Sequence, residues 1–274
     1  MATRHTAPMP STPNPRLHRP APGVLAISID SAQAFPRHAH DTYGIGRIRR
    51  GAQRSWSAAG WVEAGPGDLV MVNPGEVHDG QPIDDLGRHW QMLYLDPGLV
   101  DAAAAETLPG GRPPPLWRPV ARDAQLAAAF EWWHARLAAD AGALACDEAQ
   151  LALLATVFAR HGAAVAPRPE SPSIARARQR LDDDPANDPG LAALAGEAGL
   201  SRFQLLRAFA RELDMTPHAY LVQRRLAVAR SLLDAGETIA GAAAAAGFAD
   251  QAHLTRLFRR SLGFTPAAYA RSRR

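Results

Sequence analysis

The sequence predicts an α+β protein, with a β-rich N-terminal part and an all-α C-terminal part. Between residues 24 and 96, short segments rich in β-branched and aromatic residues are separated by Gly and Pro turns, which is typical of a compact β-barrel or sandwich. Further along, the pattern "SRFQLLRAFARELDMTPHAY" (201–220) returns as "DQAHLTRLFRRSLGFTPAAY" (250–269). The 274 residues are enough for about two domains.

We expect five regions in chain order. Residues 1–22, rich in Pro, Thr and Ser, predict a flexible arm, and residues 23–98 a barrel with strands at "VLAISID", "YGIGRIRR", "DLVMV" and "WQMLYL". Residues 99–163 form a helical segment, with helices near 122–140 and 147–162. A Pro/Ser/Arg linker at 164–172 precedes a helical domain at 173–274.

Each copy of the repeat has the features of a helix-turn-helix. Ser201 and Asp250 are good N-caps, and a shorter helix (191–199 or 239–247) precedes each cap across a glycine turn at Gly199 or Gly247. An apolar residue recurs every four positions, at Leu205, Phe209 and Leu213 and at Leu254, Phe258 and Leu262. These stripes predict two buried faces and leave the other faces for solvent or a partner.

A continuous helical pattern at 218–235 joins the two copies, and it would fix two recognition helices about 34 Å apart, the spacing of successive major grooves. From residue 172 onward, fifteen Arg stand against ten acidic residues (net +5), whereas the first 171 residues have fifteen Arg against seventeen (net −2). The basic part therefore suits double-stranded DNA. A purely structural helical repeat is the alternative, but such repeats usually need at least three copies.

The motifs "RRLAVARSLL" and "GFADQAHLTRLFRRSLGFTPAAY" resemble the AraC family of bacterial transcription regulators over residues 172–274. The resemblance implies a DNA-binding regulator that reads two adjacent grooves, usually as a homodimer, with RNA polymerase as a further partner. The bare alanines at 242–246 depart from the family pattern, because larger residues are usual at Ala244 and Ala245. This departure predicts a less tightly packed helix.

With the apolar stripes buried, the remaining helix faces present the side chains that we expect to read DNA. Arg207 and Arg256 are the strongest candidates for base contacts, because bidentate Arg–guanine pairs are the commonest specific contact. A phosphate contact or an internal salt bridge is the alternative for both. The predicted DNA-binding residues are Arg202, Phe203, Leu206, Arg207, Gln251, Ala252, Thr255 and Arg256.

The segments "FPRHAHDTYGIGRIRRG" and "AGPGDLVMVNPGEVHDG" resemble the two halves of a cupin, the barrel that many AraC-family members use to sense a small-molecule effector. His38, His40 and His78 match three of the four metal positions of an enzymatic cupin, and the fourth, a glutamate, is missing. The predicted effector-binding residues are His38, His40, Tyr43, Trp56, His78 and Trp90. We expect no bound metal, no cofactor and no catalytic residue; a metal-dependent cupin enzyme or metal sensor fused to a DNA-binding domain is the alternative.

Three further expectations concern the rest of the chain. The helices at 122–162 resemble the dimerisation element of such sensors. The lone Cys146 predicts no internal disulfide and no cysteine metal site. The chain has no signal-peptide pattern and no apolar run of membrane-span length, so we expect a cytoplasmic protein without a membrane partner.

Overall fold

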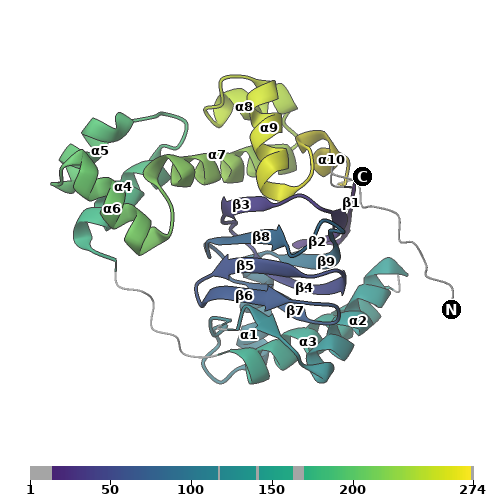
Figure 1. Ribbon diagram of the computed structural model, residues 1–274. Coiled ribbons are helices and arrows are strands. Elements are labelled where there is room, and N and C mark those ends of the chain that lie inside the picture. Colours follow the sequence, from purple (N-terminus) through teal and green to yellow (C-terminus); the bar gives the residue numbers. More distant parts are fainter. Residues whose placement is uncertain (1–13, 117, 140–141, 163–169, 273–274) are drawn as a thin grey trace. The chain divides into compact units, whose positions relative to one another are not determined.

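The computed structural model describes residues 14–116, 118–139, 142–162 and 170–272. The chain divides into two compact units, one of residues up to 36 together with 41–165, the other of residues 37–40 together with 166–274. We call them the N-terminal and the C-terminal unit. The first carries the strands, except for the last two residues of one of them, and three helices. Residues 166–274 of the second carry helices in their described part, so the predicted α+β class is confirmed (Figure 1).

The N-terminal unit contains two stacked sheets (Figure 1). The six-stranded sheet has the order β1-β2-β9-β4-β7-β10, with β1 Asn14–Ala21, β2 Val24–Ser31, β9 Arg88–Leu95, β4 Tyr43–Arg50, β7 Leu69–Val72 and β10 Val120–Ala121, and its pairs are antiparallel. The four-stranded sheet has the order β3-β8-β5-β6, with β3 Phe35–His38, β8 His78–Pro82, β5 Gln53–Ser57 and β6 Gly60–Ala64.

Because side chains alternate along a strand, the register assigns each residue of the six-stranded sheet to one of two faces. The outer face packs against the helices in one hydrophobic core. Its residues include Val24, Ile45, Leu69, Leu93 and Leu95. The opposite, inner face looks toward the four-stranded sheet. It carries Ile27, Ile29 and Ser31 of β2, Gly44, Gly46 and Ile48 of β4, and Arg88, Trp90 and Met92 of β9.

The helices α1 Pro97–Thr107, α2 Ala124–Ala138 and α3 Ala143–His161 cover the outer face. Phe130 and Trp133 of α2 are fully buried in this core. Glu131 forms ion pairs with Arg47 and Arg49 of β4, and together these two contacts lower the pKa of its carboxyl although burial acts in the opposite direction. Asp123 caps α2 and accepts hydrogen bonds from the backbone of its first turn.

Several expectations for this unit need correction. Residues 14–21 form the edge strand β1, whereas their composition predicts a flexible arm; residues 1–13 of that predicted arm lie outside the described residues. Edge strands tolerate proline, so the prolines in β1 misled the prediction. The strands β5 and β6 and the helix α1 were not predicted, and α3 begins four residues earlier than expected.

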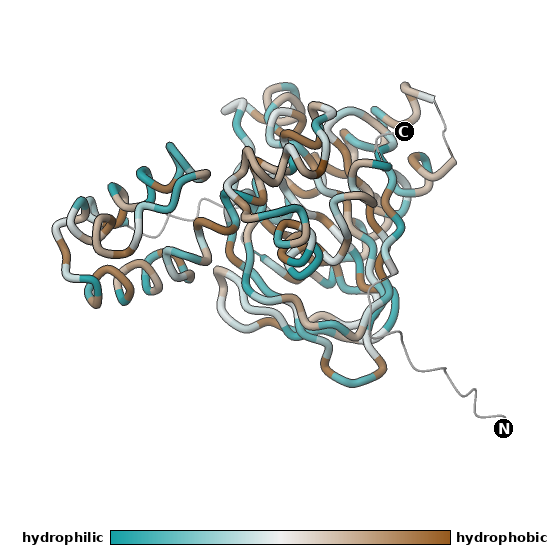
Figure 2. The backbone as a smooth tube through the Cα atoms, turned by 90° about the horizontal axis from the view of Figure 1, so that it is seen from above, coloured by the Kyte–Doolittle hydropathy of each residue, from teal (hydrophilic) through white to brown (hydrophobic). Residues whose placement is uncertain are grey.

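The C-terminal unit is a series of seven helices in its described residues: α4 Pro172–Asp183, α5 Gly190–Ala198, α6 Arg202–Leu213, α7 Pro217–Asp234, α8 Ile239–Ala245, α9 Gln251–Leu262 and α10 Pro266–Arg271. Hydrophilic and hydrophobic stretches alternate along its helices in Figure 2. The linker at 164–172 falls mostly outside the described residues. No helix of the described parts is long and apolar enough to cross a membrane.

The tertiary structure shows that the repeat is larger than the helix-turn-helix. A long helix precedes each copy, α4 before α5–α6 and α7 before α8–α9, and each is tied to the residue that ends the repeated pattern. The hydroxyl of Tyr220 donates to Asp182 of α4 at 2.7 Å, and the hydroxyl of Tyr269 donates to Asp234 of α7 at 2.9 Å. The helix α7 is therefore the last helix of the first copy of the repeat and the first helix of the second copy.

The two helix-turn-helix units contact each other through the loop between α4 and α5. Arg225 of α7 donates to the carbonyl oxygens of Pro185 and Ala186, at 2.7 and 3.2 Å. The same Ala186 lies against the turn glycine of the second unit, Gly247, so closely that a Cβ on this glycine would collide with the loop backbone. Besides α7 itself, this loop contributes to the relative placement of the two recognition helices.

Candidate DNA interface and effector site

The geometry of both turns agrees with the sequence signals. Gly199 and Gly247 have φ of 68° and 80°, a region that L residues rarely occupy. Ser201 and Gln204 form a capping box at the start of α6, and the carboxylate of Asp250 accepts from the backbone N–H of His253 at the start of α9. These caps orient the first turn of each recognition helix.

The helix α6 buries Leu205 and Phe209 and exposes the opposite face. Phe203 is 66% exposed, and the guanidinium of Arg207 lies over its ring at 5.5 Å from the centroid. Arg202 is also exposed. An exposed aromatic ring next to two arginines is unusual for a solvated helix face and suits a polyanionic partner.

The helix α9 has the same design. It buries Leu254 and Phe258, and it exposes Gln251, Ala252 and Arg256. The Thr255 side chain is half-buried, and its hydroxyl donates to the backbone carbonyl of Gln251 in the same helix. Of the four predicted reading positions on α9, Thr255 is therefore the least available for a base contact.

The ion pairs divide the arginines of the C-terminal unit into two groups. Arg211 pairs with Glu212 at 2.7 Å, and Arg224 lies 3.0 Å from Asp182. In the described part of the chain, by contrast, no acidic side chain forms an ion pair with the exposed arginines of the two recognition helices: Arg202, Arg207, Arg256, Arg259 and Arg260. The recognition helices thus keep cations that internal pairing has not neutralised.

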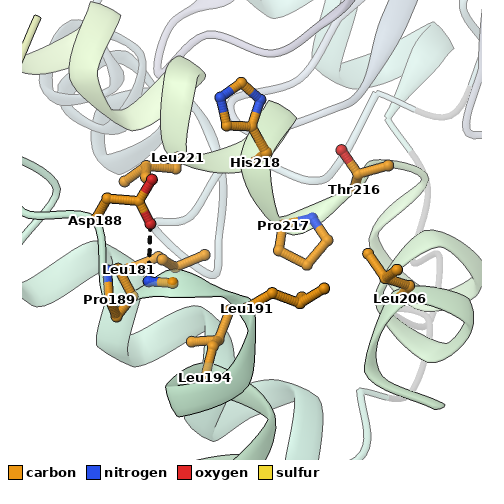
Figure 3. Close-up of a pocket in the computed structure, with 11 residues that line it drawn as sticks. Leu181, Asp188, Pro189, Leu191, Leu194, Leu206, Thr216, Pro217, His218 and Leu221 are labelled. Carbon is orange, nitrogen blue, oxygen red and sulfur yellow. Dashed lines mark hydrogen bonds between the residues drawn. The ribbon is translucent and has the colours of Figure 1, made fainter. Parts of the chain in front are cut away.

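Leu206 has a second environment. It is 37% exposed and lines an apolar pocket of about 430 Å³ between α5, α6 and the start of α7. Figure 3 shows the Leu206 side chain together with Leu191 and Pro217 around this space. Asp188 also lines the pocket, and its carboxylate accepts a hydrogen bond from the backbone N–H of Gly190. Leu206 is therefore shared between the exposed face of α6 and this pocket.

The alanines of α8 do not cause the loose packing that the sequence predicts for this helix. Ala242, Ala243 and Ala246 are buried, whereas Ala244 and Ala245, the two positions that depart from the family pattern, are exposed. Their small size consequently leaves no gap in the core.

Two of the predicted effector-binding residues lie on inner faces of the N-terminal unit. Trp90 of β9 is buried, and its ring meets that of Phe35 edge to face at 5.7 Å. His78 opens β8 two residues before Gly80, so it lies on the same side of that strand, toward the six-stranded sheet. Its ring hydrogen-bonds the Glu76 carbonyl oxygen through Nδ1, and burial lowers the pKa of the imidazole.

Tyr43 and Trp56 do not point inward as expected. Tyr43 packs against the helix-covered core, and burial, followed by the nearby Asp101 charge, raises the pKa of its hydroxyl. Trp56 lies opposite Trp61 in the β5–β6 register, with the ring centroids 5.6 Å apart, and Trp61 is 46% exposed. Both faces of these sheets carry apolar residues, so alternation alone could not tell which face lines the interior.

His38 and His40 do not lie on one strand. The strand β3 ends at His38, so His40 lies beyond it, and strand alternation cannot place the two side chains on one side. Their ring centroids are 6.2 Å apart. No group of three or more His, Cys, Asp or Glu in the described residues could hold a metal ion. His38, His40 and His78, which match three metal positions of an enzymatic cupin in sequence, do not form such a group.

Arg88 is a buried charged residue that the sequence analysis missed. It is 1% exposed, and its guanidinium lies between the two sheets, with its carbon 4.6 Å from the Trp90 ring centroid and 5.6 Å from that of Phe35. The signal was present in "RHWQML", because Arg88 shares the two-residue period of Trp90 and Met92.

Comparisons with known proteins agree with this architecture. Residues 21–154 match the AraC-like ligand binding domain, and residues 194–272 match a helix-turn-helix domain. The protein YbfI of Bacillus subtilis (strain 168), described as an uncharacterized HTH-type transcriptional regulator, is 30% identical over 227 residues, which span 81% of this chain and 82% of that protein. The chain belongs to the AraC family of transcription regulators. It combines a ligand-binding part with a helix-turn-helix DNA-binding part, which confirms the resemblance drawn from the motifs.

Solved structures share the fold of this AraC-family regulator along most of its length. ToxT from Vibrio cholerae O395 is 11% identical, with a TM-score of 0.56 over 95% of this chain and 98% of that chain. Wild-type ToxT of strain SCE256, solved with an unsaturated fatty acid bound, is also 11% identical, with a TM-score of 0.55 over 97% of both chains. At this identity the likeness shows the fold alone.

Proposed function

We propose that α6 and α9 enter two successive major grooves of promoter DNA and read its bases through Arg207 and Arg256. The observation that carries this proposal is the pairing pattern of the arginines: these two are exposed on the recognition helices and have no acidic partner in the described residues. Eighteen residues of α7 span about 27 Å, a length that suits helices placed one DNA turn apart. Phe203 and Ala252 would contact thymine methyl groups or sugar.

The regulation proposed for this protein acts through a small organic effector between the two sheets. Trp90 and His78, on inner faces, are the candidate contacts that the geometry supports, and His38 and His40 remain candidates at the end of β3. Effector binding would change promoter occupancy or the contact with RNA polymerase. The protein would act in the cytoplasm by binding DNA and effector and not by catalysis, which is the role of an HTH-type transcriptional regulator.

We further propose a homodimer formed through α2 and α3. Trp132 of α2 and Leu144 of α3 are large apolar side chains that remain exposed, the latter by 75%. The opposite faces of these helices are buried on the six-stranded sheet. In this arrangement residues 173–274 form a DNA-binding domain, and the dimer would place two such domains on one operator.

The test of DNA reading begins with operator selection from random fragments by the purified full-length protein. Arg207→Ala and Arg256→Ala should each weaken operator binding by about 1 to 3 kcal/mol and relax base preference in separate half-sites. Arg211→Ala is the matched control, because Arg211 lies on α6 but is paired with Glu212. Equal losses on every sequence would assign the two arginines to phosphate, and no loss would exclude them from the interface.

A further inference from the structure

Arg88 holds a positive charge in the interior of the N-terminal unit. Its Nε donates to Oε1 of Gln53 at 2.9 Å, and its two Nη atoms donate to the carbonyl oxygens of Gln33 and Gly80 at 3.2 and 3.1 Å. All three acceptors are neutral. No Asp or Glu in the described part of the chain forms an ion pair with Arg88. A guanidinium has five N–H donors, so two remain for a further acceptor.

This arrangement is costly for the protein alone. Burial lowers the pKa of Arg88 to about 10, but the guanidinium is still protonated at neutral pH. The rings of Trp90 and Phe35 offer cation–π contacts, which compensate for only part of the lost hydration. Buried charges in proteins are usually paired with an opposite charge, and none of the described residues supplies one to Arg88.

The strands around Arg88 carry small inward residues. Gly44 and Gly46 of β4 face Met92 and Tyr94 of β9, and a Cβ at Gly46 would collide with the Met92 side chain. Across the interior, β5 and β8 present Ser55, Ser57 and Gly80 in the alternation that includes Gln53. The Met92 side chain fills the space beside Gly46, and because it is flexible, its repacking would open room for a guest next to these small neighbours.

We propose that the effector is an organic acid, whose carboxylate binds the free N–H groups of Arg88 while its apolar body packs against Trp90. A carboxylate supplies the missing opposite charge and two acceptor oxygens in the planar geometry that guanidinium prefers. This inference rests on the proposed function, in which the space between the sheets holds the effector, and it adds the chemical class. A purely structural role, in which Arg88 joins the two sheets through Gln53 and Gly80, is the competing interpretation.

The experiment compares carboxylates with their neutral amides on the full-length protein by titration calorimetry. The probes are acetate, benzoate and octanoate, with acetamide, benzamide and octanamide; acetate is small enough to fit wherever any carboxylate fits. At least one acid should bind at least tenfold more tightly than its amide. This comparison needs no variant, so it remains decisive even if substitution of the buried Arg88 prevents folding.

Variants then assign the preference to Arg88. Arg88→Gln should remove the preference for the acid, and Arg88→Lys should retain part of it, since the charge remains. Arg54→Gln is the matched control: Arg54 lies on the other face of β5, over the Trp61 ring, and its loss should leave acid binding unchanged. Equal binding of acid and amide in the natural protein, no binding of any probe, or a preference that survives Arg88→Gln would overturn the proposal.

Operator titrations with and without the acid that binds separate this inference from the proposed regulation. If the acid binds through Arg88 and shifts operator affinity, both hold. If it binds through Arg88 and operator affinity does not change, the carboxylate site stands and the effector control is wrong.

Discussion

Replacing Gly247 by alanine should damage the DNA-binding part far more than the equivalent change at Gly199. Both glycines occupy the turn of a helix-turn-helix with positive φ, so alanine is strained at either position. Their surroundings differ. A Cβ on Gly199 has no atom within 4 Å, whereas a Cβ on Gly247 would lie 2.7 Å from the Cα of Ala186 and closer still to its carbonyl oxygen. Backbone atoms cannot move aside as a flexible side chain can.

The magnitudes follow from these two terms. Left-handed backbone costs an alanine about 1 to 2 kcal/mol, and the reduced entropy of the unfolded chain returns about 0.4 to 1 kcal/mol at both sites. Overpacking against the Ala186 loop adds about 1 to 3 kcal/mol at Gly247 only. We therefore expect a loss of about 1 kcal/mol for Gly199→Ala and about 2 to 4 kcal/mol for Gly247→Ala.

Urea unfolding of the full-length protein measures the difference with an internal control. All six tryptophans lie between residues 56 and 133, so tryptophan fluorescence reports the N-terminal unit, while helical circular dichroism also reports the C-terminal unit. Gly247→Ala should shift the dichroism transition and leave the fluorescence transition in place. Gly247→Ala should also weaken operator binding, because the Ala186 loop contributes to the placement of the second helix-turn-helix. Equal stability losses for both variants would refute the role assigned to the loop contact.

Two further predictions concern hydrogen bonds between elements. Tyr220→Phe removes the hydroxyl that donates to Asp182, a bond between α7 and α4, and should lower the stability of the C-terminal unit by about 1 to 2 kcal/mol in the same unfolding assay; an unchanged midpoint would show that the bond contributes nothing. Asp123 has its pKa lowered, chiefly by the hydrogen bond from Arg160. A lowered carboxyl pKa gives stability that is present above the ordinary pKa, near 4, and is lost as pH falls below it. Asp123→Asn keeps the helix cap but removes the charge. When fluorescence-detected unfolding is repeated from pH 6 down to pH 3, the N-terminal unit of this variant should therefore lose less stability than that of the natural protein. Equal losses in the two proteins would show that the Asp123 charge does not stabilise the fold.

The C-terminal part could be predicted from sequence because its signals are local. A Ser or Asp cap, a glycine turn and an apolar residue every four positions act within one or two helical turns, and α5, α6, α8 and α9 lie where these signals place them. The duplication supported the prediction further, because the same helix signals occur at equivalent positions in both copies. The partners of Tyr220 and Tyr269 lie 38 and 35 residues away, and no local pattern indicates them.

In the N-terminal part, sequence predicted the strands β2, β4, β7 and β9 but not which face of each strand looks inward. The six-stranded sheet is covered on both sides, by helices and by the second sheet, so Tyr43 and Trp90 look equivalent in sequence although they lie on opposite faces. The polar strand β1 is held by its pairing with β2, and Arg88 finds its acceptors on β5, on β8 and at Gln33. Strand pairing and burial are relations between distant residues, and only the tertiary structure decides them.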